Sequence, residues 1–404
     1  MSSSYKLIFI CQVFYPDKTS TSQLFTPLIQ SLRKQGIEVL VICGFPVKGD
    51  SSKVLRKEEF NGVTIKRCGL RLPLKRNFIL RSVAYLTFLF ETLFNLLCSP
   101  NEARWLGVTN PPFLAWILAF SAVVKRRSYC FFFHDLHPEG LVALGSLSRS
   151  VWYVKTWKAI NRWSYRYANH LLVLGRDMIP LLSKEYGLNS EKLIYLPHWS
   201  ASELRSPVAF SESKFTRYLK LKDKFVVQYS GNMGLWHDIE SFVFAAKQLE
   251  EERHIQFVFI GGGLRRNQAE LLALELECMN IQWHDFVELK DLPESLAACH
   301  ISLISLRAGL EGVAVPCKLY GILAAGRAVV AQVPADSEVS LAVNEHKCGV
   351  VVHPGDLDEL VNVLKRLSDN PNEVDSMGCN AFAAYEQYYR IENAVQSLKS
   401  ELNL

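Results

Sequence analysis

The chain has 404 residues, with 45 Lys and Arg against 40 Asp and Glu, so its net charge is only +5 at pH 7. Hydrophobic residues make up 49% of the chain, which argues against a disordered protein, and the small charge argues against a nucleic-acid partner. Mean hydropathy is +0.07, high for a soluble enzyme and far too low for a polytopic membrane protein. The length predicts two domains.

The ten cysteines are scattered, and no two of them form a Cys-x-x-Cys pair. This spacing gives no support to a zinc ribbon or a thioredoxin-like motif. It indicates free thiols in a reducing compartment. The N-terminus runs directly into an apolar, strand-like segment, so we expect no secretory signal peptide and a cytoplasmic protein.

Short apolar runs alternate with segments of helical length along the whole chain. The runs are unbroken, which is typical of parallel strands buried on both faces. The pattern occurs twice around a polar stretch at residues 200–224, and it predicts two doubly wound α/β domains. Ligands bind beyond the carboxyl ends of such strands, so we expect the site in the cleft between the domains. The predicted strands are residues 6–11, 39–43, 129–133, 170–174, 225–229, 256–260, 301–305, 328–332 and 349–352.

The unbroken apolar strands explain part of the positive mean hydropathy, and three further segments explain the rest. Residues 78–98 are long and apolar but contain Arg81 and Glu91, so a transmembrane helix is disfavoured, and a buried helix and a membrane-facing surface helix both stay open. Residues 113–124 are too short to span a bilayer. Residues 149–167 mix Trp and Tyr with Lys and Arg. That mixture suits either a membrane interface with anionic head groups or a packed helix with a solvated basic face, and both interpretations stay open.

The most informative segment follows the strand predicted at 301–305. Pro316 suits the first turn of a helix, whose free N–H groups would attract a diphosphate. Lys318 adds a cation beside this helix start, and Gly326 ends the helix before the next strand.

This segment resembles the donor-binding segment of family 4 retaining glycosyltransferases, which have the GT-B fold. The resemblance extends along nearly the whole chain, and the most similar subgroup assembles bacterial capsule, O-antigen and exopolysaccharide. The matching motifs are Glu311, Pro316-Cys317-Lys318-Leu319, Leu323-Ala324-Ala325-Gly326, Phe14-Tyr15-Pro16, Thr109-Asn110-Pro111-Pro112, His134-Asp135-Leu136-His137-Pro138-Glu139, Tyr229-Ser230-Gly231-Asn232-Met233-Gly234, Ile260-Gly261-Gly262-Gly263 and residues 334–338.

The resemblance implies two Rossmann-like domains, each with a doubly wound parallel sheet, that face one another across a cleft. We place an acceptor-binding domain at residues 1–203 and a nucleotide-sugar-binding domain at residues 204–385. A C-terminal helix within residues 386–404 is expected to pack back on the first domain.

The same resemblance implies the site residues. His134 or Asp135 would orient the acceptor hydroxyl or accept its proton. The catalytic candidates are His134, Asp135, Lys318 and Glu311. The candidates for binding the donor and its phosphates are Gly231, Asn232, Gly234, His237, Gly262, Arg265, Val315, Pro316, Leu319 and Glu338. The candidates for binding the acceptor are Thr19, Ser22, Gln23, Asn110 and Glu139.

The chain departs from the family pattern at the acidic pair. The family's two Glu residues fall here at Val313 and Gly321, and Glu311 lies two residues before the first position. In the family the second Glu holds the nucleotide ribose, so another group must make that contact.

The family's Arg and Lys of the glycine loop are also missing, and their places fall at Asn232 and His237. Phosphate neutralisation would then rest on the helix start, Lys318, and Arg265 or Arg266. His237 is interpreted either as a residue that becomes cationic beside a diphosphate or as a residue at the surface start of a helix.

A metal site is disfavoured. In His134-Asp135-Leu136-His137, adjacent residues on an extended segment point in opposite directions, which suits three ligands poorly. Asp356-Leu357-Asp358 begins a predicted helix, so capping explains it better. We therefore expect no metal and no cofactor.

The resulting hypothesis is a retaining glycosyltransferase of the hexosyltransferase type. It would move a sugar from a UDP-, GDP- or TDP-linked donor to a lipid-linked or other amphiphilic acceptor, without a metal ion. We expect it to lie peripherally at the inner face of the cytoplasmic membrane, against an anionic surface. Two alternatives stay open: a sugar-nucleotide epimerase of the same fold, and a non-catalytic nucleotide-sugar-binding partner in a polysaccharide assembly complex.

Overall fold

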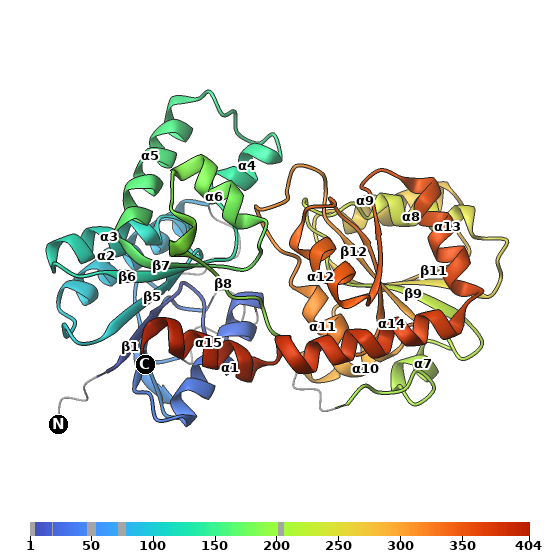
Figure 1. Cartoon of the computed structure of the whole chain (residues 1–404), viewed down its shortest axis with the longest axis horizontal. Helices are drawn as coiled ribbons and strands as arrows, with labels where there is room; N and C mark the ends of the chain where they lie inside the picture. Colours follow the sequence, from blue (N-terminus) through green and yellow to red (C-terminus); the bar gives the residue numbers. More distant parts are fainter. Residues whose placement is uncertain (1–4, 18, 47–53, 72–77, 201–205) are drawn as a thin grey trace. The chain divides into compact units, whose positions relative to one another are not determined.

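The computed structural model describes residues 5–17, 19–46, 54–71, 78–200 and 206–404. The chain divides into two units: Met1–Pro197 with Ile391–Leu404, and His198–Arg390 (Figure 1). The predicted boundary between residues 203 and 204 lies outside the described residues, and the second unit ends at Arg390 rather than at residue 385.

The first unit is built on a sheet in the order β3-β4-β2-β1-β5-β6-β7-β8. All its pairs are parallel except the antiparallel pair β3–β4. The strands are β1 (Leu7–Ile10), β2 (Val39–Cys43), β3 (Lys57–Phe60), β4 (Val63–Arg67), β5 (Arg104–Val108), β6 (Tyr129–Phe133), β7 (Ala168–Val173) and β8 (Leu193–Tyr195). The helices are α1 (Ser20–Lys34), α2 (Phe78–Leu97), α3 (Leu114–Val124), α4 (Glu139–Ala143), α5 (Trp152–Tyr167), α6 (Met178–Tyr186), the 3-10 turn η2 (Ser190–Lys192) and α15 (Ile391–Leu402).

The second unit has an entirely parallel sheet in the order β11-β10-β9-β12-β13-β14. Its strands are β9 (Phe225–Asn232), β10 (Ile255–Gly262), β11 (Ile281–His284), β12 (Ile301–Ser305), β13 (Ala328–Gln332) and β14 (Gly349–Val352). Its helices are α7 (Lys214–Tyr218), α8 (Glu240–Gln248), α9 (Arg266–Glu275), η3 (Leu289–Asp291), α10 (Leu292–Ala297), α11 (Lys318–Ala324), α12 (Glu338–His346), α13 (Leu357–Ser368), α14 (Pro371–Ala384) and the π-helical turn η4 (Tyr385–Tyr389).

Each sheet therefore has a Rossmann-like, doubly wound order, and the predicted fold class is confirmed. The strand order reverses between β1 and β5 in the first unit and between β9 and β12 in the second. A crevice opens beyond the carboxyl ends of the strands at such a switch point. The candidate site residues follow these four strands and the strands β6, β10 and β13 beside them.

All nine predicted strands are present, but the prediction missed β3, β4, β5, β8 and β11. The strands β3, β8 and β11 lie at sheet edges, where one-sided exposure weakens an unbroken apolar pattern. In β5 the pattern is broken by Gly107. A Cβ at Gly107 would lie 2.3 Å from Leu118 Cδ1, so this glycine lets α3 pack closely on the sheet.

Four predictions about helices can be compared with the structure. The segment at 78–98 forms α2, and only 22% of its most apolar stretch is buried, so the buried-helix alternative does not hold and the membrane-facing alternative stays a prediction. The helix expected to start at Pro316 starts at Lys318, and α15 starts at Ile391 after a π-helical turn. Capping is confirmed at Asp356, whose side chain accepts a hydrogen bond from Glu359 N at 3.0 Å.

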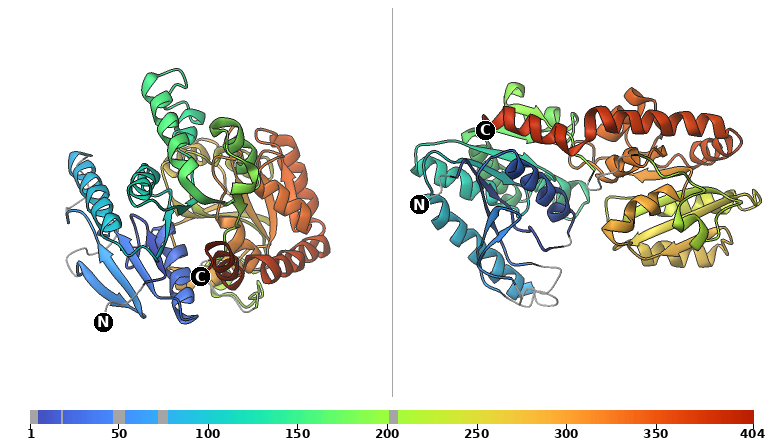
Figure 2. Two further views of the ribbon diagram at one scale, coloured as in Figure 1. Left: turned by 60° about the vertical axis from the view of Figure 1, so that its left-hand side comes forward. Right: turned by 90° about the horizontal axis from the view of Figure 1, so that it is seen from below.

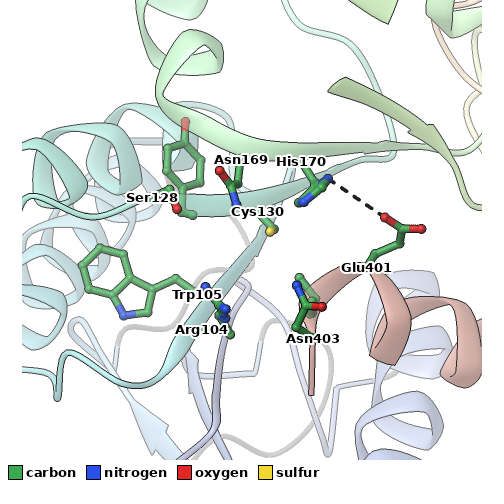
Figure 3. Close-up of a pocket in the computed structure, with 10 residues that line it drawn as sticks. Arg104, Trp105, Ser128, Cys130, Asn169, His170, Glu401 and Asn403 are labelled. Carbon is green, nitrogen blue, oxygen red and sulfur yellow. Dashed lines mark ion pairs between the residues drawn. The ribbon is translucent and has the colours of Figure 1, made fainter. Parts of the chain in front are cut away.

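The C-terminal helix α15 belongs to the first unit. It packs against α1, and Lys399 Nζ donates to Gln35 Oε1 at 2.9 Å. A small polar pocket lies under its end, at the amino ends of β5, β6 and β7, where His170 Nδ1 is 4.0 Å from Glu401 Oε2 (Figure 3). This pocket is at the edge of the sheet opposite to the switch point.

In the second unit, β9 and β10 stay paired into their glycine turns, with Gly261 opposite Gly231 and Gly262 opposite Asn232. Gly261 has φ +134°, and a Cβ there would lie 2.0 Å from the carbonyl oxygen of Gly231. Gly263 has φ +143°, and its Cβ would lie 2.4 Å from the carbonyl oxygen of Met233. The glycine triplet therefore serves first to bring two backbones together.

We predict that Gly261→Ala lowers the free energy of unfolding by roughly 2–4 kcal/mol, because it combines a left-handed φ with a backbone clash. Gly321→Ala is the matched control: its Cβ would meet only Leu296 Cδ1 at 3.5 Å, inside α11. There we expect a gain of about 0.5–1 kcal/mol. Denaturant unfolding measures both, and an unaffected Gly261→Ala would contradict the close-approach argument.

Candidate functional site

The switch point of the second sheet brings two loops together. His237 Nδ1 lies 2.6 Å from the carbonyl oxygen of Ser305, at the end of β12. Asp238 N donates to Ser305 Oγ at 2.8 Å. The glycine loop after β9 is therefore tied to the carboxyl end of β12, where the segment leading to α11 begins.

Lys318, the first residue of α11, points its ammonium group into this region. Its Nζ lies 3.6 Å from the centroid of the Tyr229 ring, a cation–π geometry. The loop passes beside the lysine at Gly231: a Cβ there would make ordinary van der Waals contacts of 3.6 Å with Lys318 Cε and 3.7 Å with Nζ. The lysine is thus held between an aromatic face and a glycine backbone.

The Nζ atom of Lys318 is buried and has no hydrogen-bond partner among the described residues. Burial lowers the pKa of Lys318 to about 7. An ammonium group without a carboxylate is costly in such an environment, and an anion placed beside it would remove that cost. This arrangement makes Lys318 the centre of a candidate anion site.

His237 is not a second cation. Burial, together with the charge of the neighbouring Lys318, lowers its pKa to about 3. A neutral ring next to the Ser305 carbonyl carries its proton on Nδ1, because that carbonyl only accepts. Nε2 is then left as an acceptor. His237 is half-buried and lies three residues before α8, so both interpretations of this residue stay predictions.

The two arginines considered for phosphate binding have carboxylate partners. Arg265 Nη1 lies 2.8 Å from Glu240 Oε1. Arg266 Nε lies 2.7 Å from Glu270 Oε1, and its Nη1 contacts Asp285. Lys318, unlike either arginine, has no acidic partner in the described structure. Sequence spacing alone did not reveal these pairings.

The remaining donor candidates surround the same loops. Glu311 Oε2 accepts a hydrogen bond from Gly309 N at 2.8 Å and so shapes the loop after β12. Leu319 is fully buried, which leaves only its backbone for a ligand, and Glu338 begins α12 with 1% exposure. The others occupy the two glycine turns and the approach to α11: Asn232, Gly234, Gly262, Val315 and Pro316.

In the first unit, His134 and Asp135 follow β6 at its carboxyl end. His134 N donates to Thr109 Oγ1 at 2.6 Å, and the His134 ring lies 5.0 Å from that of Phe25. Burial lowers the pKa of His134 to about 3 and raises the pKa of Asp135 to about 6. At neutral pH the imidazole is therefore neutral and Asp135 is mainly ionised, so Asp135 is the group suited to accept a proton.

The acceptor candidates lie around the loops after β1 and β5. Thr19 precedes α1; its N–H donates to Asp17 Oδ1 at 2.9 Å, and its buried Oγ1 has no hydrogen-bond partner in the described part of the chain. The carbonyl oxygen of Asn110 accepts a hydrogen bond from Gln12 N at 3.0 Å, which joins the two loops. Ser22 and Gln23 lie in the first turn of α1.

Glu139 has a structural environment that its motif did not reveal. Its carboxylate accepts a hydrogen bond from the Tyr186 hydroxyl at 2.6 Å and lies 3.3 Å from Lys158 Nζ, and the residue is 6% exposed. These contacts fasten α4 to α5 and α6. A role in acceptor binding stays a prediction. Among the residues that the structure describes, no group of three His, Cys, Asp or Glu could hold a metal ion.

Comparisons with known proteins agree with this organisation. Residues 210–383 match the family Glycosyl transferases group 1. The chain is 27% identical over 291 residues to the probable glycosyltransferase WbjE of Pseudomonas aeruginosa, covering 70% of this chain and 72% of WbjE. It is 25% identical over 371 residues to the putative colanic acid biosynthesis glycosyl transferase WcaI of Escherichia coli, covering 87% of this chain and 89% of WcaI.

The fold is also that of solved glycosyltransferase structures. Anabaena HepE in complex with UDP superposes with a TM-score of 0.72 at 15% identity, covering 98% of this chain and 99% of HepE. Residues 210–383 of the second unit thus match a group 1 glycosyltransferase domain, and the chain has the GT-B fold. The glycosyltransferase resemblance is confirmed to this extent, while membership of family 4 and retention of configuration stay predictions.

We predict that Lys318→Met stabilises the protein. The pKa of Lys318 is lower in the folded than in the unfolded chain, so its contribution to stability is lost as pH falls from about 10.5 to about 7. Removing the amine should therefore raise the free energy of unfolding by roughly 3–5 kcal/mol at pH 6.5, and by about 1 kcal/mol at pH 9.5.

Denaturant unfolding at both pH values tests this expectation. Lys247→Met, which removes an exposed lysine paired with Glu250, should show no comparable gain. A Lys318→Met variant that is less stable than wild type at pH 6.5 would show that the ammonium has a partner in the native protein.

Proposed function

We propose that this protein transfers a sugar from a nucleotide sugar to a lipid-linked or other amphiphilic acceptor in polysaccharide biosynthesis. In this proposal the anomeric configuration is retained and no metal ion is needed. The protein acts in the cytoplasm, at the inner face of the membrane. The observation that carries the proposal is the buried, unpartnered ammonium of Lys318 at the switch point of a group 1 glycosyltransferase domain.

The names of similar proteins support the substrate classes. HepE structures contain UDP and UDP-glucose, and WcaI is named for colanic acid biosynthesis. By analogy, the second unit of this chain binds a nucleoside diphosphate sugar, and the acceptor belongs to a polysaccharide pathway. The base, the sugar and the linkage are left to experiment.

Lys318 suits the departing diphosphate. As the glycosidic bond to the donor breaks, negative charge grows on the leaving oxygen, and a preorganised cation in a dry site stabilises it strongly. The pKa of Lys318, about 7 without ligand, rises when the diphosphate binds, so the lysine is charged when it is needed. This cation performs the electrostatic task that a divalent ion performs in other transferases, which supports metal independence.

Asp135 suits the acceptor side. With its pKa raised to about 6, it is ionised at neutral pH, yet it is a stronger base than an ordinary carboxylate. We assign it the acceptor hydroxyl proton, and His134, neutral and packed against Phe25, a hydrogen bond to a substrate hydroxyl.

We predict that Lys318→Met weakens nucleoside diphosphate binding about 10–100-fold, because a charge-assisted contact is lost. A screen of nucleotide sugars for protection against thermal unfolding first identifies the donor, since a ligand at 100 times its Kd adds about 2.7 kcal/mol. Calorimetry with the matching diphosphate at pH 8.5, in buffers of different ionisation enthalpy, then counts protons. Wild type should take up a proton on binding, and the variant should not.

Lys247→Met again serves as the control and should keep both the affinity and the proton uptake. Equal affinity in wild type and Lys318→Met would remove the lysine from the mechanism. Failure of wild type to bind any nucleotide would favour a non-catalytic role, and an epimerised donor formed without an acceptor would favour an epimerase.

We predict that Asp135→Asn lowers kcat at least about 100-fold and leaves donor affinity unchanged, because the amide cannot accept a proton. In wild type, kcat should fall as pH drops through about 6, since protonated Asp135 is inactive. Steady-state transfer between pH 5 and 8 measures this limb. The exposed Glu102→Gln variant should keep the wild-type profile, and an active Asp135→Asn variant with that same profile would assign the proton to another group.

A further inference from the structure

Helix α2 exposes an apolar face. Ile79, Val83, Leu86, Phe90 and Phe94 are 69%, 38%, 61%, 71% and 64% exposed. Their spacings of three and four residues place them on one side of the helix. A surface helix of a soluble domain normally shows its charged residues on that side, so this pattern is inverted.

The other sides of α2 are occupied by the protein itself. Phe88 and Leu96 are buried against the first unit. Glu91 Oε2 lies 3.1 Å from Arg56 Nη1, and Lys66 Nζ donates to Asn95 Oδ1. These contacts hold α2 along the domain surface, at the edge of the first unit (Figure 2). A helix whose C-terminal half is held in this way can lie in a membrane surface.

The apolar surface continues onto α3, which packs between α2 and α5. Phe120, Val123 and Val124, in the last turns of α3, are 49%, 42% and 54% exposed. The exposed Arg126 follows directly. The exposed apolar residues of α2 and α3 together are called the apolar surface below.

The neighbouring helix α5 supplies basic and aromatic residues. Trp152 is 74% exposed and Trp163 is 38% exposed, and Lys155, Arg162 and Arg166 are also exposed. No acidic residue occurs in α3 or α5, and Glu91, the only one in α2, is paired. Glu185 of α6, the acidic residue that faces α5, is paired with Lys158.

We propose that the apolar surface of α2 and α3 inserts into the interfacial layer of an anionic lipid bilayer, with α5 at the level of the head groups. Such binding has three components. Apolar side chains insert among the acyl chains, basic side chains lie near the anionic head groups, and tryptophan side chains lie at the boundary between them. A second copy of the chain fits this surface poorly, because each copy would bring its own basic helix to the interface. The inference concerns membrane binding alone and does not depend on the transferase reaction.

Flotation of the full-length protein with vesicles tests the proposal, with phosphatidylglycerol-containing vesicles compared with pure phosphatidylcholine. We expect wild type to float with the anionic vesicles and the triple variant Leu86→Gln, Phe90→Gln, Phe94→Gln to lose at least about 90% of that binding. The matched control, Leu271→Gln with Leu274→Gln, removes leucines of the second unit that are 61% and 73% exposed, and should float like wild type.

A second variant separates the electrostatic part. Lys155→Gln, Arg162→Gln, Arg166→Gln should lose the preference for anionic over neutral vesicles, and wild-type binding should weaken as salt increases. Because all the altered residues are exposed, we expect each variant to unfold at the same midpoint as wild type. Equal midpoints would show that the variants are folded. Wild type that stays in the soluble fraction, or equal flotation of the α2 variant and its control, overturns the proposal. Sedimentation showing a dimer that the α2 variant dissociates would instead assign the surface to a second copy.

Discussion

The second unit is organised around one buried charge without a partner. The ammonium of Lys318 lies over the face of Tyr229 and against the backbone at Gly231, with a neutral histidine as its other polar neighbour. Gly261 lets the backbones of β9 and β10 approach each other at Gly231, and the hydrogen bond between His237 and the Ser305 carbonyl ties the glycine loop to the end of β12. Burial lowers the pKa of this lysine to about 7, so an anion that bound here, as we propose, would bring a proton with it. Burying this lysine lowers the free energy of unfolding, and in our proposal the same lysine raises the affinity for the ligand, a combination that is common at binding sites.

The two units use their polar and apolar residues differently. In the second, Arg265 is paired with Glu240, whereas Lys318 Nζ has no hydrogen-bond partner among the described residues, which is why we propose it as the group that recognises an anion. In the first, the buried groups at the strand ends are a neutral His134 and a basic Asp135, while the outer helices carry apolar and cationic side chains. A donor that is a soluble anion and an acceptor that resides in a membrane would require this division.

Much of the fold and part of the site could be predicted from the sequence. Strands buried on both faces are apolar throughout, so β1, β6 and β12 were visible, while the half-exposed edge strands β3 and β11 were not. The resemblance named Lys318, His134 and Asp135 as candidates, and the structure places His134 and Asp135 after β6 and Lys318 at the start of α11, while their roles stay predictions. The partners of Arg265 and Glu139 come from distant segments, and no local pattern reports them.

The sequence by itself determined the two-domain α/β class, the strands buried on both faces and the position of the lysine after β12, since these depend on short-range periodicity and spacing. Only the tertiary structure decided which charges are paired and which faces are covered. The apolar residues of α2 have the spacing of a helix buried on one side, but the side that packs on the domain holds Phe88 and Leu96, and the side with Phe90 and Phe94 stays exposed. Periodicity shows that a helix has an apolar face. The packing of the whole domain decides whether that face is covered by the rest of the protein or stays exposed.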